Sequence, residues 1–432
     1  MIKFLHTADI HLDSPLCGLE RYDGAPVNEL RCATREALRN LVELAISEQV
    51  NFLLIAGDLY DGDWKDYNTG LFFAKEMSRL READVRVYVV FGNHDAASQI
   101  TKKLGSIPSN VHHFSSKKPK TEIMEDIGVA IHGRSFPKRA VTEDISTAYP
   151  EARPGYFNIG ILHTSLTGRE GHEPYAPCTI DGLVSKNYHY WALGHVHKRE
   201  VVHEDPWIIF PGNIQGRHIR ETGAKGCTLV TVEDNESVLV EHRDLDVLRW
   251  QVCNVDASGA ESPEEIIERV NIEIKRKIDD SESRLLALRV SISGNCTAHE
   301  EILANPEKWT SEIRAASTDE SGGRVWIEKV KVNTRAPIDL EKMAERNDPV
   351  GDLLRFIQEI DSSLVDIGEP VGDIIEITKQ LSDDFAKLKT KLPTEIRQDS
   401  DLDMKNPDTF HRILEDAKQV LVSRLLSKGG LW

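Results

Sequence analysis

Residues 52–58 read Phe-Leu-Leu-Ile-Ala-Gly-Asp, so that five apolar residues run directly into a glycine and a carboxylate. An apolar run of this length is typical of a buried β-strand. Four more strand-like runs end shortly before an Asp, Asn or His; they are residues 3–7, 87–91, 158–162 and 190–193. Helical segments such as residues 28–49 lie between the runs, so residues 1–250 have the pattern of a layered α/β domain.

The polar residues that follow these five runs are candidate metal ligands. In an open α/β sheet the carboxyl ends of the strands line up along one edge, where ligands bind. Carboxylates, an amide and imidazoles together suit a dication such as Mn²⁺, Fe²⁺ or Zn²⁺. A shared carboxylate, for which Asp58 is the obvious residue, can hold two dications about 3.5–4 Å apart. The predicted ligands are Asp9, His11, Asp58, Asn93, His163, His195 and His197.

The composition narrows the class of protein. The chain has 432 residues, 40% of them hydrophobic and 29% charged, which fits several soluble domains and excludes a disordered or collagen-like chain. No apolar run reaches the roughly 18 residues of a membrane span. No signal-peptide pattern is present and the six cysteines form no CxxC pair, so we expect a cytoplasmic protein with reduced thiols. The net charge of −18 permits nucleic acid as a partner but does not suggest it.

The pattern changes near residue 250. The sequence Ser262-Pro-Glu-Glu265 predicts a helix start, and Leu286, Leu288, Val290 and Ile292 alternate as in a half-buried strand. A second helix–strand unit follows at 306–316 and 324–334. We therefore predict domains at 1–250 and 251–336, followed by a helical region at 337–432. The amphipathic stretch at 410–425 either packs on its own domain or docks a partner protein.

The motif order over residues 3–200 is Asp-x-His, Gly-Asp, Gly-Asn-His-Asp, His and Gly-His-x-His. This order resembles the signature of the calcineurin-like metallophosphoesterases. The stretches at 6–16, 57–64, 92–98, 162–166 and 192–197 resemble more closely the YhaO group of bacterial DNA-repair exonucleases, which is similar to the SbcD nuclease subunit. The resemblance implies an α/β fold with a four-layer α/β/β/α core, a small α/β capping domain at 251–336 and two metal ions, typically Mn²⁺.

The same resemblance implies roles for individual residues. One metal would be held by Asp9, His11, Asp58 and His197, and the other by Asp58, Asn93, His163 and His195. His94 would be a catalytic histidine that binds no metal, oriented by Asp95. Archaeal and eukaryotic relatives have a second histidine three residues after the bridging aspartate, whereas this chain has Asp61 there, as bacterial SbcD-type sequences do.

Basic residues near the motifs are candidates for contacts to substrate phosphates. The segment after the last metal motif, Pro211–His218, contains Arg217 and His218. The segment after His163 contains Arg169. We predict substrate binding by Arg169, Arg217 and His218.

The sequence thus favours a phosphodiesterase that cleaves DNA in repair or end processing, chiefly as an exonuclease and with endonuclease activity as a further expectation. By resemblance its partners are DNA, an SMC-like ATPase of the SbcC or YhaN type and a second copy of the chain, with no membrane. A protein phosphatase is disfavoured, because Asp58 is not followed by the Val-Asp-Arg-Gly pattern of that class. A small-molecule or cyclic-nucleotide phosphodiesterase stays open. So does a scaffold subunit that mainly binds DNA ends or the ATPase.

Overall fold

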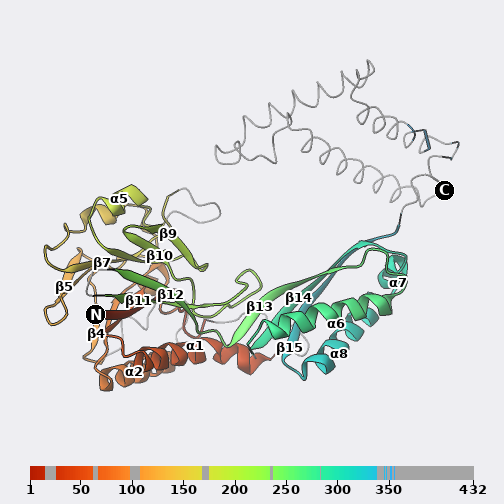
Figure 1. Ribbon diagram of the computed structural model, residues 1–432, viewed down its shortest axis with the longest axis horizontal. Helices are drawn as coiled ribbons and strands as arrows, with labels where there is room; N and C mark the ends of the chain where they lie inside the picture. The colour runs from red at the N-terminus through yellow and green to blue at the C-terminus, as the bar shows by residue number, and fades with distance from the viewer. Residues whose placement is uncertain are drawn as a thin grey trace, which may run out of the picture. The chain divides into compact units, whose positions relative to one another are not determined.

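A computed structural model of the chain describes residues 1–14, 26–61, 67–97, 108–167, 175–233, 237–282 and 284–337, and also residues 345, 347, 351, 352 and 355. By internal contacts the chain forms two units, residues 1–336 and 337–432 (Figure 1). The predicted helical region, with its amphipathic stretch at 410–425, lies almost entirely outside the described residues and stays a prediction.

Within the described ranges, the first sheet has six strands in the order β12-β11-β1-β2-β3-β4. The strands β1 to β4 are parallel, and β11 pairs antiparallel with β1. Helices α1 (Val27–Ser47) and α2 (Tyr67–Glu82) pack their apolar residues on the outer face of this sheet. The strands are β1 (Ile2–Thr7), β2 (Phe52–Ala56), β3 (Arg86–Val90), β4 (Val111–His113), β11 (Gly226–Val232) and β12 (Val238–Asp244).

The second sheet also has six strands in the described residues, in the order β5-β6-β7-β8-β10-β9. Its central strands β6, β7, β8 and β10 are parallel. The outer face is covered by the short helix α5 (Ile180–Val184), the 3-10 turn η2 (Ser146–Ala148) and loops around Trp191. The strands are β5 (Lys120–Met124), β6 (Val129–Gly133), β7 (Phe157–His163), β8 (Tyr190–Gly194), β9 (Glu200–Glu204) and β10 (Trp207–Phe210).

The two sheets pack face to face through one apolar cluster. Phe4 and Phe52 from the first sheet and Ile159 and Tyr190 from the second are fully buried in it. Residues of both sheets alternate between this interior and an outer layer, as the two-residue period of a strand requires. The predicted four-layer α/β/β/α core is confirmed, with a thin fourth layer.

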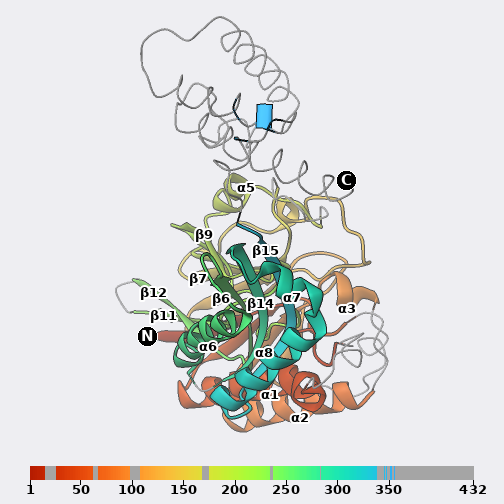
Figure 2. The ribbon, with the colours of Figure 1, turned by 90° about the vertical axis from the view of Figure 1, so that its right-hand side faces the viewer.

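A smaller α/β module follows the core. The parallel strands β13 (Leu248–Asp256), β14 (Leu285–Asn295) and β15 (Val325–Arg335) carry α6 (Pro263–Asp279), α7 (His299–Ala304) and α8 (Pro306–Ser321) on one face, as Figure 2 shows. The hydroxyl of Ser262 accepts a hydrogen bond from the Glu265 amide and caps α6. The first strand, β13, runs across the predicted division between residues 250 and 251.

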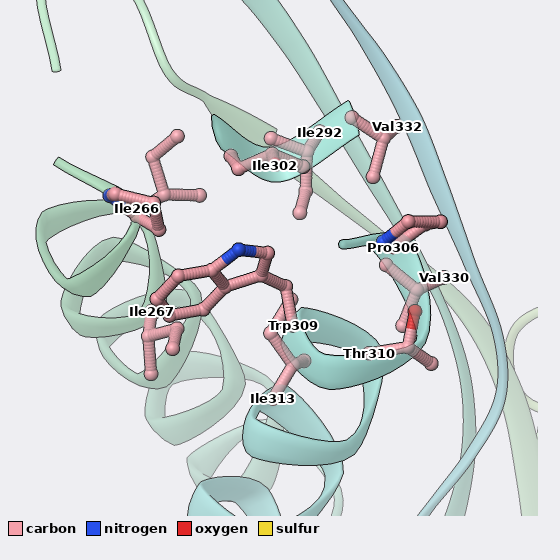
Figure 3. A pocket seen from close by; sticks show the side chains of 11 residues that line it. Ile266, Ile267, Ile292, Ile302, Pro306, Trp309, Thr310, Ile313, Val330 and Val332 are labelled. Atoms are coloured by element: carbon pink, nitrogen blue, oxygen red, sulfur yellow. The ribbon is translucent and has the colours of Figure 1, made fainter. Parts of the chain in front are cut away.

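The interior of this module is apolar. Figure 3 shows the indole of Trp309 among isoleucines from α6, α7 and β14 around a hollow of about 10 Å³. A space of that size holds at most one water molecule, and its lining offers such a molecule almost no polar partner. The hollow is therefore part of the module's core.

The module is fixed to the core at the base of β13. Leu248 and Trp250 of β13 pack with Leu30 of α1 and with Trp326 of β15, and Figure 1 shows α1 beside β13. The Trp250 and Trp326 rings meet edge to face with their centroids 5.8 Å apart. No helix among the described residues is both long and apolar enough to cross a membrane.

Candidate metal centre

The predicted ligands gather where strands of both sheets end. Asp9 and His11 follow β1, Asp58 follows β2, and Asn93 begins the short helix α3 (Asn93–Ala97) after β3. From the second sheet, His163 is the last residue of β7, and His195 and His197 follow β8. Five of the seven are almost fully buried; they are Asp9, His11, Asp58, Asn93 and His163.

The ligand atoms form two neighbouring groups. Asp9, His11 and His197 form one group and Asp58, His163 and His195 another, each with its ligand atoms within 4.8 Å of one another. His11 Nε2 lies 3.9 Å from Asp58 Oδ2 and so links the two groups. The structure therefore brings six of the predicted ligands together, and the seventh, Asn93, lies beside them with its Oδ1 2.9 Å from His163 Nε2.

A divalent cation fits the space between these atoms. His163 donates its Nδ1 hydrogen to the Ala56 carbonyl oxygen at 2.9 Å, which leaves the Nε2 lone pair facing Asn93 Oδ1 at 2.9 Å and Asp58 Oδ2 at 3.4 Å. Three electron-rich atoms this close repel one another unless a cation or a proton lies among them. Burial lowers the pKa of His163, but the charge of Asp58 and its hydrogen bond outweigh burial and raise that pKa to about 9.

The other group shows the same arrangement. His197 Nδ1 lies 2.7 Å from Glu221 Oε1, so this nitrogen carries the hydrogen and Nε2 presents its lone pair. That Nε2 lies 3.3 Å from His11 Nε2 and 3.8 Å from Asp9 Oδ1. A carboxylate behind a metal-binding histidine fixes the ring in this manner.

Three of the predicted ligands have a strained, left-handed backbone conformation. Asp9, His11 and Asp58 have φ between 45° and 52°, in the left-handed region that costs non-glycine residues about 1–3 kcal/mol each. Hydrogen bonds between the loops hold them there, from the Asp9 amide to the Gly57 carbonyl and from the His11 amide to the Asp58 carbonyl, both at 3.0 Å.

Two glycines allow the backbone to lie close to the side chains of the predicted ligands. A Cβ atom at Gly57 would lie 2.3 Å from His163 Nδ1, and one at Gly92 would lie 2.3 Å from Asp58 Oδ1. Gly194 is different, because a Cβ atom there would meet the Ala56 carbonyl oxygen at 1.9 Å. Gly194 thus serves the packing of β8 on β2.

That Asp95 orients His94 stays a prediction. This buried carboxylate accepts hydrogen bonds from the amides of Leu59, Tyr60 and Gly92, so it joins the loops that follow β2 and β3. Burial and the charge of Asp58 raise its pKa to about 7. The carboxylate hydrogen-bonded to the His94 imidazole is that of Asp61, whose Oδ1 lies 2.8 Å from His94 Nδ1.

Asp61 was not assigned a role from the sequence. Its carboxylate also accepts a hydrogen bond from Ser14 Oγ at 2.6 Å. Burial lowers the pKa of His94, but the hydrogen bond to Asp61 and the charge of Asp58 outweigh it and raise that pKa. His94 also belongs to a third possible ligand group with His11 and Asp58.

The predicted substrate residues have different positions. Arg217 lies beside the ligands, with its guanidinium nitrogens 3.2 Å from Glu221 Oε1 and 3.9 Å from Asp61 Oδ2. His218 is exposed, and its Nε2 lies 3.6 Å from Glu221 Oε1. Arg169 lies outside the described residues.

Sequence reasoning also missed Glu221, because no motif marks an acid 24 residues after its histidine. It is 6% exposed, and its Oε2 accepts hydrogen bonds from Asn213 Nδ2 at 3.0 Å and the Arg217 amide at 2.8 Å. Burial raises the pKa of Glu221, but the hydrogen bond to His197 and the charge of Arg217 outweigh burial and hold that pKa well below its ordinary value.

We expect Glu221→Gln to weaken the binding of one Mn²⁺ ion by about 10–100-fold, because the charge that orients His197 is lost. Isothermal titration of the metal-free protein measures this directly. The matched control is Glu328→Gln, which alters another buried glutamate, paired with Arg289 in the small module. Equal affinities for the wild type and Glu221→Gln would show that Glu221 has no such role.

We expect Asp61→Asn to lower turnover by about 10–100-fold while metal binding is kept, since a hydrogen bond between charged groups contributes about 1.5–3 kcal/mol. Loss of the Asp61 charge also lowers the pKa of His94, so the alkaline limb of the rate profile should move to lower pH. A pH–rate profile on a small phosphodiester, with metal content measured in parallel, checks both effects. An unchanged alkaline limb would contradict the pairing.

Comparison with known proteins gives two family matches. Residues 2–199 match the calcineurin-like phosphoesterases, and residues 250–335 match the middle domain of metallophosphoesterase YhaO. Over 265 residues the chain is 40% identical to "Uncharacterized metallophosphoesterase YhaO" of Bacillus subtilis, covering 60% of this chain and 64% of that protein. Over 296 residues it is 26% identical to the DNA double-strand break repair protein Mre11 of Methanopyrus kandleri, covering 62% of each. The matched region spans less than two thirds of either relative.

Proposed function

We propose that this chain, whose residues 2–199 match the calcineurin-like phosphoesterases, is a two-metal phosphodiesterase that cleaves DNA. The observation that carries the proposal is the pair of ligand groups around Asp58, in which lone pairs from both sheets face one space. Mn²⁺ is our proposal for the metal, because carboxylate, amide and imidazole ligands suit it.

Asp9, His11, Asp58 and His197 would hold one ion, and Asp58, Asn93, His163 and His195 the other. Bound divalent cations supply charge stabilisation for a phosphoryl group and activate water at neutral pH. The protein's own residues hold the substrate and move protons. His94 is partly exposed beside the ligands, and its raised pKa favours the imidazolium form, which can donate a proton to the leaving oxygen.

Two features support a diester of DNA as the substrate. The chain is similar to proteins named for the repair of DNA double-strand breaks, and the similarity extends beyond the phosphoesterase core. Arg217, 14% exposed beside Asp61, can contact a phosphate that approaches the ligands. We propose exonuclease action in repair or end processing.

The remaining assignments are proposals that rest on the resemblance. They are an SMC-like ATPase partner, a homodimer, a cytoplasmic location and the division into domains at 1–250, 251–336 and 337–432. The ATPase would dock on the amphipathic stretch at 410–425. A deletion of residues 337–432 that abolishes ATPase capture and keeps diester hydrolysis would support this division of labour.

The test is Mn²⁺-dependent cleavage of end-labelled single- and double-stranded DNA, run alongside bis-p-nitrophenyl phosphate with His94→Ala as the control. Cleavage of DNA by the wild type, lost in the variant, supports the nuclease and gives its polarity. Hydrolysis of the small diester with DNA left intact, even with the ATPase present, favours a small-molecule phosphodiesterase. Inactivity on both substrates contradicts the proposal.

A further inference from the structure

The loop of residues 211–223 lies between the metal centre and the small α/β module. On the side that faces the metal centre, the loop supports His197 through Glu221. The Asn213 side chain and the Arg217 backbone amide both donate hydrogen bonds to the Glu221 carboxylate. The backbone amide of Asn213 also donates a hydrogen bond to the His197 carbonyl oxygen at 3.3 Å. On this side the loop therefore holds both the backbone and, through Glu221, the ring of a predicted ligand.

On its opposite side the loop is hydrogen-bonded to β13 of the module. Gln215 is 2% exposed, and its side chain spans the junction. Its Nε2 donates to the Leu248 carbonyl at 2.6 Å, and its Oε1 accepts from the Val247 amide at 2.9 Å. The indole of Trp250 donates to the Gly216 carbonyl oxygen at 3.1 Å.

The loop is tightly packed between the metal centre and β13. A Cβ atom at Gly216 would lie 2.7 Å from the Glu221 carbonyl oxygen and 3.1 Å from Cδ1 of Trp250. The loop is thus closely packed between the residue that supports His197 and the first strand of the module. The Gln215 carbonyl oxygen also accepts from Asn213 Nδ2 at 2.8 Å, which continues the hydrogen bonds from β13 to Glu221.

We propose that Gln215 and Trp250 are positioning residues that couple the small module to the imidazole of His197. The hydrogen bonds from Leu248 through Gln215 and Asn213 to Glu221 are continuous, so a displacement of β13 has to be absorbed by the loop and by Glu221. The coupling is reciprocal: metal binding at His197 stabilises the contacts of the module, and loss of those contacts weakens metal binding. The inference rests on the proposed metal centre and adds that the small module influences the affinity of this centre for metal.

The test uses two variants of the full chain. Gln215→Glu removes the donor to the Leu248 carbonyl oxygen and keeps an acceptor for Val247. Trp250→Phe removes the indole N–H and keeps a ring against Trp326. Trp326→Phe is the matched control, because it alters the same aromatic pair but none of the hydrogen bonds to the loop described above.

In titrations of metal-free protein, both variants should bind one of two Mn²⁺ ions about tenfold more weakly, and Trp326→Phe should match the wild type. Melting temperatures without metal identify a variant that merely unfolds. The second readout is the ¹⁵N-histidine spectrum of the metal-free protein, in which the His197 ring should lose its fixed tautomer in both variants. An unchanged His197 ring together with unchanged Mn²⁺ affinity would overturn the inference. If the wild type binds no Mn²⁺, the proposed function fails, and the ring spectrum alone decides the coupling.

Discussion

Replacing His94 with alanine should lower turnover by about 10²–10⁴-fold, the usual contribution of a positioned general acid, while both metal ions stay bound. His94 Nδ1 lies 2.8 Å from Asp61 Oδ1, and the raised pKa of the imidazole favours the protonated form that a general acid requires. The measurement is kcat on bis-p-nitrophenyl phosphate at saturating Mn²⁺, with bound metal determined on the same samples.

The control for this variant is His112→Ala, which removes an imidazole that stacks on Tyr88 at the edge strand β4. It should keep both turnover and metal. His94 also forms a possible ligand group with His11 and Asp58, so its removal could cost the protein a metal ion instead of a general acid. Loss of one metal ion in His94→Ala would show that His94 is a ligand.

Replacing Asp58 with asparagine should have the largest effect on metal binding. Its two oxygens face different parts of the site: Oδ2 lies 3.4 Å from His163 Nε2 and 3.9 Å from His11 Nε2, and Oδ1 accepts from the His94 amide. The amide of asparagine carries no charge and offers one oxygen, so it cannot be shared between two dications. We expect binding to weaken by more than the about 10–100-fold typical of residues behind the ligands, and hydrolysis to be lost.

Equilibrium dialysis against Mn²⁺, followed by metal analysis, measures this loss. Asp126→Asn is the control, since it neutralises an exposed carboxylate that pairs with Arg86 and is not one of the predicted ligands. Full occupancy of both ions in Asp58→Asn would remove Asp58 from its bridging position and contradict the site assignment.

Much of the site can be predicted from the sequence because its ligands follow strand ends directly. Apolar runs indicate the strands. Parallel pairing then brings Asp9 and Asp58 to one edge of the first sheet, and His163 and His195 to one edge of the second. The small module is predicted equally well where its patterns are local, as in the capping of α6 by Ser262. The strand β13 is harder to predict, since Trp250 and Arg249 are buried at a junction and break a simple alternation.

The supporting residues could not be predicted in the same manner. Glu221 and Gln215 act through contacts with residues that are 24 to 33 positions away, and no local spacing signals such contacts. The contacts of Asp95 could not be predicted from its place next to His94 in sequence, because its carboxylate accepts hydrogen bonds from the amides of Leu59, Tyr60 and Gly92. Asp61 occupies the expected loop, but its pairing with His94 depends on how two loops meet.

The central claim is that hydrolysis depends on two metal ions held around Asp58. The most direct measurement titrates Mn²⁺ into chelator-treated protein and follows bound metal and hydrolysis of bis-p-nitrophenyl phosphate in the same samples. We predict that hydrolysis rises with the second bound ion, is absent from the metal-free protein and is lost in Asp58→Asn. Hydrolysis by the metal-free protein, or none with both ions bound, would contradict the claim.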